Sequence, residues 1–345
     1  MSNNTALYTK YRPQSFKEVV GQEALVEALQ QAVKSKTPAH AYIFSGTRGV
    51  GKTTVARIFA KELGVSAKDT YELDAASNNS VDDIRDLRES VSTLPFEGDY
   101  KVYILDEAHM LSKSAFNAFL KTLEEPPSYC IFILATTEPE KLPDTIHSRS
   151  QVYTLNSPRK KELAELIKSI ATQEGYQLGD GADDLIAALA NGSFRDGISA
   201  LQKVLASTDS KTILVDDVER ITGAPKGALL NDILTGIAGS NTEQSLTAIS
   251  ELVQGGVGLP LSIELLLERA RAVLLLRHGG TNGAKILAQQ FGKDDLVELQ
   301  VLADNKESKL RAGALLELLH AQAHMHSSSI KHLPLELAII KLSEL

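Results

Sequence analysis

The 345-residue chain contains a single cysteine, Cys130. One cysteine excludes an intramolecular disulfide framework and any zinc or iron–sulfur module that needs several cysteines. The sequence has no 18-residue stretch without charges, so we expect no membrane-spanning helix and no membrane partner. The first residues, 1–5, lack the basic run and apolar core of a secretory signal. These absences predict a cytoplasmic protein.

Basic side chains are also fewer than acidic ones, 36 against 44, which gives a net charge of −8. This balance argues against a surface covered with nucleic-acid contacts. The distribution is uneven, because residues 1–64 carry 9 basic and 4 acidic groups. A basic first segment on an acidic body favours a local phosphate site, with chance clustering as the alternative.

Strand and helix patterns alternate between residues 40 and 155. Uninterrupted apolar runs at 41–44, 101–105 and 130–135 predict buried strands, and a helical pattern covers 52–63. Such an order is typical of a parallel sheet with helices on both faces.

Beyond this region the pattern is almost entirely helical. Ser157 suits a helix N-cap and Pro158 the first helical position. A Gly/Pro-rich segment at 223–227 predicts a second linker. We therefore expect an α/β domain over 1–157, a small helical domain over 158–224 and a larger helical domain over 225–345.

The most specific pattern is the GxxxxGK[ST] sequence that follows the first strand. Glycines let backbone N–H groups approach phosphate oxygens, and the following helix presents its N-terminus to the anion. Lys52 reaches the terminal phosphates, and the Thr53 hydroxyl is suited to Mg²⁺. The predicted nucleotide-binding loop comprises Gly46, Thr47, Arg48, Gly49, Val50, Gly51, Lys52, Thr53 and Thr54.

Two adjacent carboxylates, Asp106 and Glu107, follow the second predicted strand. At the carboxyl edge of a parallel sheet they would lie beside the phosphate loop. Asp106 is predicted to hold Mg²⁺ through water, and Glu107 to polarise the attacking water as general base. His109 is interpreted as a packing or relay residue and not as a metal ligand.

Thr136 and Thr137 end the third predicted strand, where a hydroxyl could contact the γ-phosphate or the attacking water; a plain turn is the alternative. Arg149 offers a planar cation for phosphate oxygens, and a surface salt bridge is its alternative. GTP is disfavoured because the guanine-reading NKxD pattern is missing at Asn305-Lys306.

Taken together, the motifs resemble AAA+ ATPases of the clamp-loader family, with the bacterial gamma/tau branch of DNA polymerase III as the nearest match. The resemblance spans residues 6–205 in the family's order. It rests on the segments Tyr11–Gln22, Phe44–Thr54, Leu73–Ser77, Asp106–Ser112, Leu120–Pro127, Leu134–Thr137 and Gly192–Asp196. It implies a nucleotide-binding α/β domain, a small helical lid and a helical collar.

The resemblance also implies roles for individual residues. Thr137 becomes the first sensor, Arg195 the second sensor of the subunit's own ATP, and Arg149 the arginine finger of the neighbouring site. Lys52, Thr53, Asp106 and Glu107 keep the roles given above, with ATP and Mg²⁺ as cofactors. The adenine pocket would be formed by Tyr11, Arg12, Pro13, Val19 and Val20.

For the whole protein, the resemblance implies a subunit of a five-member spiral that opens a sliding clamp and closes it around primer–template DNA. Alternatives within the ATPases are an archaeal-type replication factor C small subunit and a hexameric AAA+ DNA motor. A non-hydrolysing scaffold is a further alternative, although Lys52, Glu107 and Arg149 are intact.

The sequence departs from the gamma/tau pattern at two places. The four-cysteine zinc module is missing, because residues 63–69 run almost directly into Leu73, so zinc is not expected. Ser150 stands where the family has cysteine, a change that keeps side-chain size. His320, His324 and His326 offer the only ligand-like spacing, and a solvated helix face is the favoured interpretation.

Two segments have candidate roles toward macromolecules. Polar residues at 77–80 and at Lys113-Ser114 precede predicted helices, the second of which carries Asn117 and Lys121. Their free N–H groups suit DNA phosphates, and ordinary N-caps are the alternative. Leu94-Pro-Phe96 is either plain core, which we favour, or an apolar loop tip that docks on the clamp.

Overall fold

A computed structural model describes residues 5–255, 258–288, 291, 293–325 and 327–344. The chain divides into two compact units. The first comprises residues 1–162 together with 192–196, and the second comprises residues 163–191 and 197–345. Residues 158–224 and 225–345 fall largely within the same unit, so their separation into lid and collar stays a prediction.

A five-stranded parallel sheet forms the centre of the first unit, in the order β2-β3-β4-β1-β5. Its strands are β1 (Ala41–Ser45), β2 (Thr70–Asp74), β3 (Lys101–Asp106), β4 (Cys130–Thr136) and β5 (Gln151–Thr154). The three strands expected from apolar runs are confirmed as β1, β3 and β4. The edge strands β2 and β5 were not predicted, because their residues are mostly half-buried or exposed and form no apolar run.

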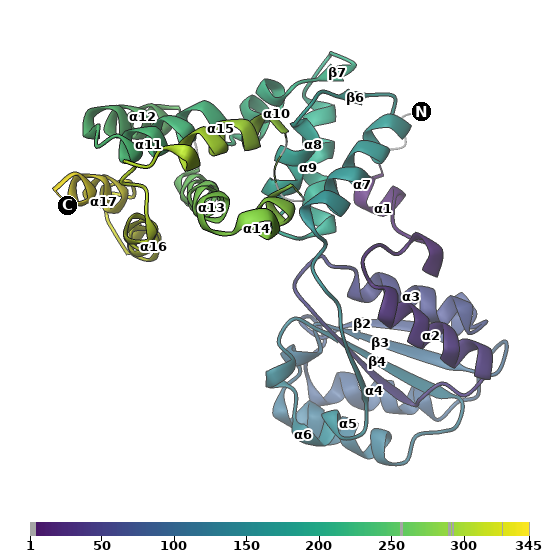
Figure 1. The fold of residues 1–345 in the computed structure, drawn as a ribbon. Coiled ribbons are helices and arrows are strands. Elements are labelled where there is room, and N and C mark those ends of the chain that lie inside the picture. Colours follow the sequence, from purple (N-terminus) through teal and green to yellow (C-terminus); the bar gives the residue numbers. More distant parts are fainter. Residues whose placement is uncertain (1–4, 256–257, 289–290, 292, 326, 345) are drawn as a thin grey trace. The chain divides into compact units, whose positions relative to one another are not determined.

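Side chains alternate along the strands and fill two hydrophobic cores, one on each face of the sheet. In β1, Ala41 and Ile43 pack on the face covered by α4 (Val81–Val91) and α5 (Lys113–Glu124). Tyr42 and Phe44 pack on the other face, which carries α2 (Glu23–Ser35) and α3 (Lys52–Glu62), as Figure 1 shows. The predicted α/β layering is confirmed. The shorter elements of this unit are α1 (Leu7–Lys10), η1 (Phe16–Glu18), η2 (Ala67–Asp69), η3 (Ala108–Met110), η4 (Pro139–Lys141) and α6 (Asp144–His147).

Serine side chains fix where α4 and α5 begin. Ser80 accepts from the Asp83 N–H group at 3.2 Å, and the Asp83 carboxylate returns to the Ser80 backbone, which completes a capping box. Ser112 accepts from the Ala115 N–H group in the same way. Helix α5 therefore starts at Lys113, inside the segment that was expected to precede it.

The loop between α4 and β3 carries an exposed apolar tip. Leu94 and Phe96 are 73% and 76% exposed, so the interpretation of this loop as plain core is wrong. The carboxylate of buried Asp69 accepts from the backbone N–H groups of Phe96 at 2.7 Å and Glu97 at 2.8 Å. Apolar character alone could not distinguish an exposed tip from a core segment.

The second unit begins in helix α7, which starts at Lys160. The predicted cap at Ser157 is wrong, because the Ser157 hydroxyl instead lies 2.9 Å from the hydroxyl of Thr47. The elements up to residue 222 are α7 (Lys160–Gln173), β6 (Gln177–Leu178), α8 (Ala182–Leu189), α9 (Phe194–Ala206), β7 (Thr212–Ile213) and α10 (Val215–Thr222).

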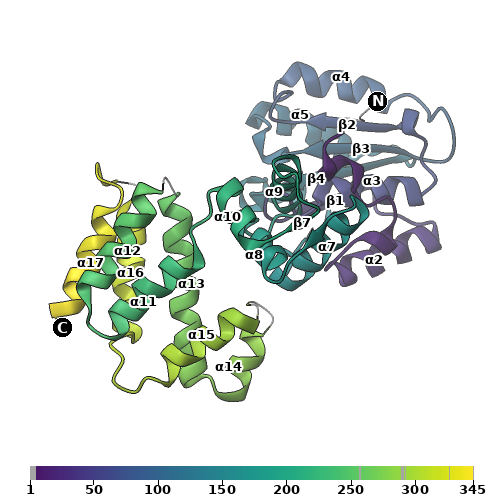
Figure 2. The same cartoon turned by 90° about the horizontal axis from the view of Figure 1, so that it is seen from above.

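In the part of this unit that the structure describes, seven further helices build one hydrophobic core. They are α11 (Gly227–Ala238), α12 (Thr242–Gln254), α13 (Leu259–His278), α14 (Gly280–Leu287), α15 (Lys293–Asp304), α16 (Ala312–Met325) and α17 (Leu333–Glu344). Helix α13 packs against α11, α14, α15 and α16, and Figure 2 shows it beside them. Its Arg277 donates to the carbonyl oxygens of Leu302, Ala303 and Leu310, which ties the end of α15 to α13. Among the described helices, none has the length and apolar character needed to cross a membrane.

Candidate active site

The loop from Gly46 to Gly51 joins β1 to α3 at the carboxyl edge of the sheet. Gly49 has a φ of +77°, and a Cβ atom there would lie 2.0 Å from the Ser193 hydroxyl. A Cβ at Gly46, whose φ is +149°, would lie 2.7 Å from the carbonyl oxygen of Leu155. Both positions therefore require glycine for the loop to adopt this path.

Lys52, the first residue of α3, folds back over this loop. Its Nζ donates to the carbonyl oxygens of Gly46 at 2.9 Å and Thr47 at 3.0 Å. Burial lowers the pKa of Lys52, while the charges of Glu107 and Asp106 act in the opposite direction. A cation held inside a loop of backbone amides is the arrangement expected for binding phosphate.

Thr53 and Asp106 meet beside Lys52. The Thr53 hydroxyl donates to Asp106 Oδ2 at 3.0 Å, and Asp106 Oδ1 accepts from the Glu107 N–H group at 3.1 Å. A hydroxyl and a carboxylate are hard oxygen donors, so the pair fits Mg²⁺. Within the described residues no group of three or more His, Cys, Asp or Glu could hold a metal ion. Phosphate oxygens and water would therefore have to complete the coordination.

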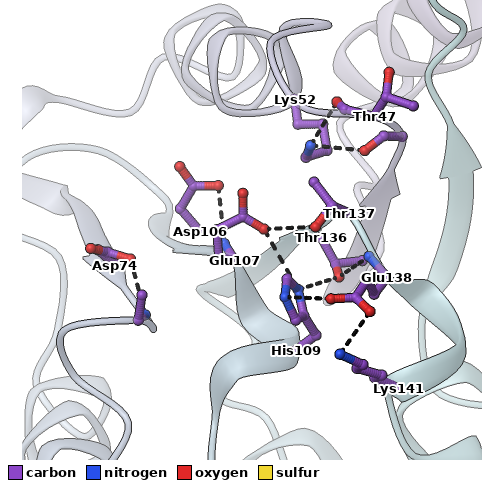
Figure 3. Close-up of polar contacts among 12 residues, drawn as sticks. Thr47, Lys52, Asp74, Asp106, Glu107, His109, Thr136, Thr137, Glu138 and Lys141 are labelled. Atoms are coloured by element: carbon purple, nitrogen blue, oxygen red, sulfur yellow. Dashed lines mark hydrogen bonds and ion pairs between the residues drawn. The ribbon is translucent and has the colours of Figure 1, made fainter. Parts of the chain in front are cut away.

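Glu107 follows Asp106 and has a backbone conformation that is uncommon for a residue with a side chain. Its φ of +48° turns the chain sharply between β3 and η3. Its carboxylate accepts from the Thr137 hydroxyl at 3.2 Å, and Figure 3 shows the two side chains pointing toward each other. The structure therefore brings Lys52, Asp106, Glu107 and Thr137 to one edge of the sheet, as the sequence predicted.

The two neighbouring threonines at the end of β4 have different partners. Thr137 contacts Glu107, whereas the buried Thr136 accepts from the Glu138 N–H group at 3.0 Å and lies 3.0 Å from His109 Nδ1. The sequence offered both hydroxyls as candidates. In the described contacts only Thr137 touches the acidic pair, and its role as the sensor stays a prediction.

Arg195 also lies near the phosphate loop. Its guanidinium carbon is 5.0 Å from the ring centre of Tyr8, and its Cβ is within 3.4 Å of the position that a Cβ on Gly49 would occupy. Nearby, burial and the charge of Arg57 lower the pKa of Arg12. The other residues of the predicted adenine pocket, Tyr11, Pro13, Val19 and Val20, are half-buried.

Arg149 is not part of this cluster. Its guanidinium pairs with Glu124 of α5 at 3.0 Å and donates to the Thr145 carbonyl and the Ser148 hydroxyl. None of these partners belongs to the phosphate loop or to the acidic pair. The neighbouring Ser150 donates to the Ile146 carbonyl at 2.8 Å.

Three residues that support the site were missed by sequence reasoning. Gln22 is buried and exchanges two hydrogen bonds with the backbone of Asn156, at 2.7 and 3.0 Å, which ties the segment after β5 to the start of α2. Ser193 caps the first turn of α9 beside Gly49. Glu138 faces His109. No sequence signal marks Glu138, because its partner is brought to it only by the pairing of β3 with β4.

Comparisons with known proteins agree with this geometry. The profile of the family described as "DNA polymerase III, delta subunit" matches residues 21–80 and 66–159. The tau subunit of DNA polymerase III from Bacillus subtilis is 41% identical over 293 residues, which are 79% of this chain and 52% of that protein. The tau subunit from Escherichia coli is 38% identical over 272 residues, which are 73% of this chain and 42% of that protein.

Among solved structures, the RuvB Holliday junction branch migration motor of Thermotoga maritima matches with a TM-score of 0.53 and 25% identity, over 66% of this chain and 79% of that one. The fold and the site thus define an AAA+ protein. Within that class, the chain is a homologue of the bacterial gamma/tau subunits of DNA polymerase III, and the resemblance seen in the sequence is confirmed. It spans about half the length of the curated relatives it matches.

Proposed function

We propose that this chain is an ATP-hydrolysing subunit of a clamp loader, and that it helps to load a sliding clamp on primer–template DNA during replication. The observation that carries the proposal is the joint placement of Lys52, Thr53, Asp106, Glu107 and Thr137 at one sheet edge. The 41% identity to a DNA polymerase III tau subunit supports it. The cytoplasm is the expected location.

The phosphate loop would bind the β- and γ-phosphates of ATP through its backbone amides and Lys52. Mg²⁺, when held by Thr53 and Asp106, would neutralise phosphate charge. Glu107 would take the proton of the attacking water, and Thr137 would orient that water or the γ-phosphate. Arg195 lies on the same unit as the loop, which suits a sensor of the subunit's own ATP, and the half-buried pocket at residues 11–13 and 19–20 would hold adenine.

Arg149 would act in a neighbouring subunit of a five-member assembly. Its present partners, Glu124 and Thr145, lie on α5 and α6 and not at the phosphate loop. A guanidinium donated across an interface adds positive charge to the transition state only when subunits are assembled. This assignment makes hydrolysis depend on assembly.

The segments that would meet DNA and the clamp lie on the α4 and α5 side of the sheet. The N-termini of α4 and α5 offer backbone N–H groups to DNA phosphates without requiring net positive charge. The exposed Leu94 and Phe96 would insert into an apolar pocket of the clamp. Asp69 holds the backbone of this tip through two hydrogen bonds, which reduces the entropy lost on docking.

The experiment measures ATP turnover and clamp loading by the reconstituted complex with primed DNA. Lys52→Ala is expected to abolish ATP binding, whereas Glu107→Gln is expected to bind ATP and trap it, because only the water-activating carboxylate is lost. The double variant Leu94→Ser/Phe96→Ser is expected to hydrolyse ATP without loading clamps, and Leu214→Ser, which is also exposed and apolar, serves as its control.

Near-native turnover by Glu107→Gln would show that another group is the base. Unwinding or translocation along DNA without a clamp would favour the hexameric motor, to which the likeness to RuvB points. Stoichiometric zinc that survives a chelator would contradict the expectation that ATP and Mg²⁺ are the only cofactors.

A further inference from the structure

The imidazole of His109 lies between two carboxylates from different parts of the chain. Its side chain is only 7% exposed. Nδ1 is 3.5 Å from Glu107 Oε2, and Nε2 is 3.3 Å from Glu138 Oε1. Figure 3 shows the ring between the two carboxylates. One ring therefore touches the proposed catalytic base on one side and a carboxylate outside the phosphate site on the other.

The surroundings of the ring are polar on both nitrogen-bearing edges. Besides the two carboxylates, Thr136 Oγ1 lies 3.0 Å from Nδ1. The second carboxylate is itself held in place, because Glu138 pairs with Lys141 at 2.7 Å and its backbone N–H donates to Thr136. Lys141 and neighbouring charges lower the pKa of Glu138, so it stays ionised. An apolar ring in this position would contact neither carboxylate with a polar atom.

Glu107 needs such an orienting contact. It lies on a left-handed turn, and its carboxylate is one-third exposed. Its described side-chain contacts are the Thr137 hydroxyl and His109. The rate of a general-base step depends steeply on the orientation of the base, because small displacements disturb the near-attack geometry.

We propose that His109 is a positioning residue for ATP hydrolysis, which orients the Glu107 carboxylate while Glu138 orients the imidazole. The inference rests on the proposed function, since it takes Glu107 as the base. Glu138 is then part of the mechanism although it contacts neither Glu107 nor the phosphate loop in any described interaction. A histidine that merely fills space would not make turnover depend on Glu138.

The test compares steady-state ATP hydrolysis by the assembled complex carrying Glu138→Gln, His109→Gln or both. Because Glu138 is about 40% exposed, its substitution is not expected to disturb folding. Each single variant is expected to lower kcat about tenfold or more, with KM for ATP and the melting temperature unchanged, because a less well oriented Glu107 slows only the chemical step. Glu140→Gln, a like substitution on the exposed face of the same 3₁₀ turn, is the matched control and should keep the native kcat.

The double variant separates positioning from packing. If Glu138 acts through His109, the double variant should lose no more activity than the more affected single variant. A native kcat in Glu138→Gln would overturn the inference. A loss of kcat in His109→Gln that is accompanied by a lower melting temperature would also overturn it. Glu107→Gln is measured in parallel. Native turnover in that variant would contradict the proposed function itself. An inactive Glu107→Gln together with a fully active Glu138→Gln would contradict only the role of His109.

Discussion

At the scale of single residues, burial and local charge determine how each group reacts. Lys52 and Cys130 are both buried, but they have different partners. The Lys52 ammonium donates to two carbonyl oxygens and lies near two carboxylates, and these groups stabilise its positive charge inside the site. Among the described residues, the Cys130 thiol, at the start of β4, makes a long contact of 3.8 Å with the Val91 carbonyl.

Cys130 is therefore predicted to be inert. Burial raises its pKa to about 11, although the charge of Lys101 acts in the opposite direction. Because the thiolate is the reactive form, labelling of the folded protein with iodoacetamide at pH 8 should be at least roughly 100-fold slower than that of an exposed cysteine. Labelling in guanidinium gives the unhindered rate as a control, and fast stoichiometric labelling without denaturant would contradict the prediction.

At the scale of elements, the sheet was predictable where its strands are buried on both faces. Strands β1, β3 and β4 form continuous apolar runs, and the phosphate loop follows the first of them. Strand β2 was not predicted, because its residues occupy half-buried and exposed positions. The different partners of Thr136 and Thr137 could not be derived from the residues themselves, because adjacent residues point to opposite sides and only the packed structure decides which side faces Glu107. Thr137 was chosen through the family resemblance alone.

The loop after α4 depends on one buried carboxylate. Burial alone would raise the pKa of Asp69, but hydrogen bonds from Phe96, Glu97 and Ser66, together with Lys101, outweigh this effect and lower it. Asp69→Asn should reduce the free energy of unfolding by about 1–3 kcal/mol at pH 7, because an amide cannot accept both backbone N–H groups as well. Urea unfolding followed by tyrosine fluorescence measures the difference, with the exposed Asp99→Asn as control.

The sign of its pH dependence follows from the lowered pKa. Asp69 stabilises the fold fully above its ordinary pKa of 3.8, and the contribution is lost as the pH falls through the lower folded value. The difference between the native protein and Asp69→Asn should therefore be constant near neutrality and shrink below about pH 4. A difference that grew on acidification would show that Asp69 is protonated in the folded state.

At the scale of the whole molecule, the proposed function distributes the catalytic groups over more than one subunit. The sequence correctly grouped Lys52, Asp106, Glu107 and Thr137, because motifs at the ends of parallel strands converge at one edge. That Arg149 lies outside this group was expected only from the family resemblance. Arg149 is bound to Glu124, is about one-third exposed and makes no described contact with the phosphate loop, and its role as a finger stays a prediction.

Arg149 is predicted to act in trans. Arg149→Ala should bind ATP normally, and in mixed assemblies its own ATP should be hydrolysed when the neighbour supplies an intact Arg149. Losing the finger at an interface should slow hydrolysis by on the order of 10³–10⁵, as in GTPases. Nucleotide titration of the isolated subunit and turnover of mixed assemblies are the measurements, with Arg220→Ala as a surface control. If Arg149→Ala weakened ATP binding in the isolated subunit as much as Arg195→Ala does, the residue would work in cis.

The strand order has a consequence for how the chain is made. Strand β1 pairs with β4 and β5, which begin only at residues 130 and 151. At synthesis rates of 5–20 residues per second, the roughly 90 residues from the end of β1 to the end of β4 take about 5–20 s to add. During that time the five apolar or small residues of β1 have no strand partner. The phosphate loop that follows β1 is then not yet held at the edge of a sheet. The nucleotide site is thus encoded early in the chain but completed late, and until then β1 is an unpaired, aggregation-prone segment that chaperones would bind.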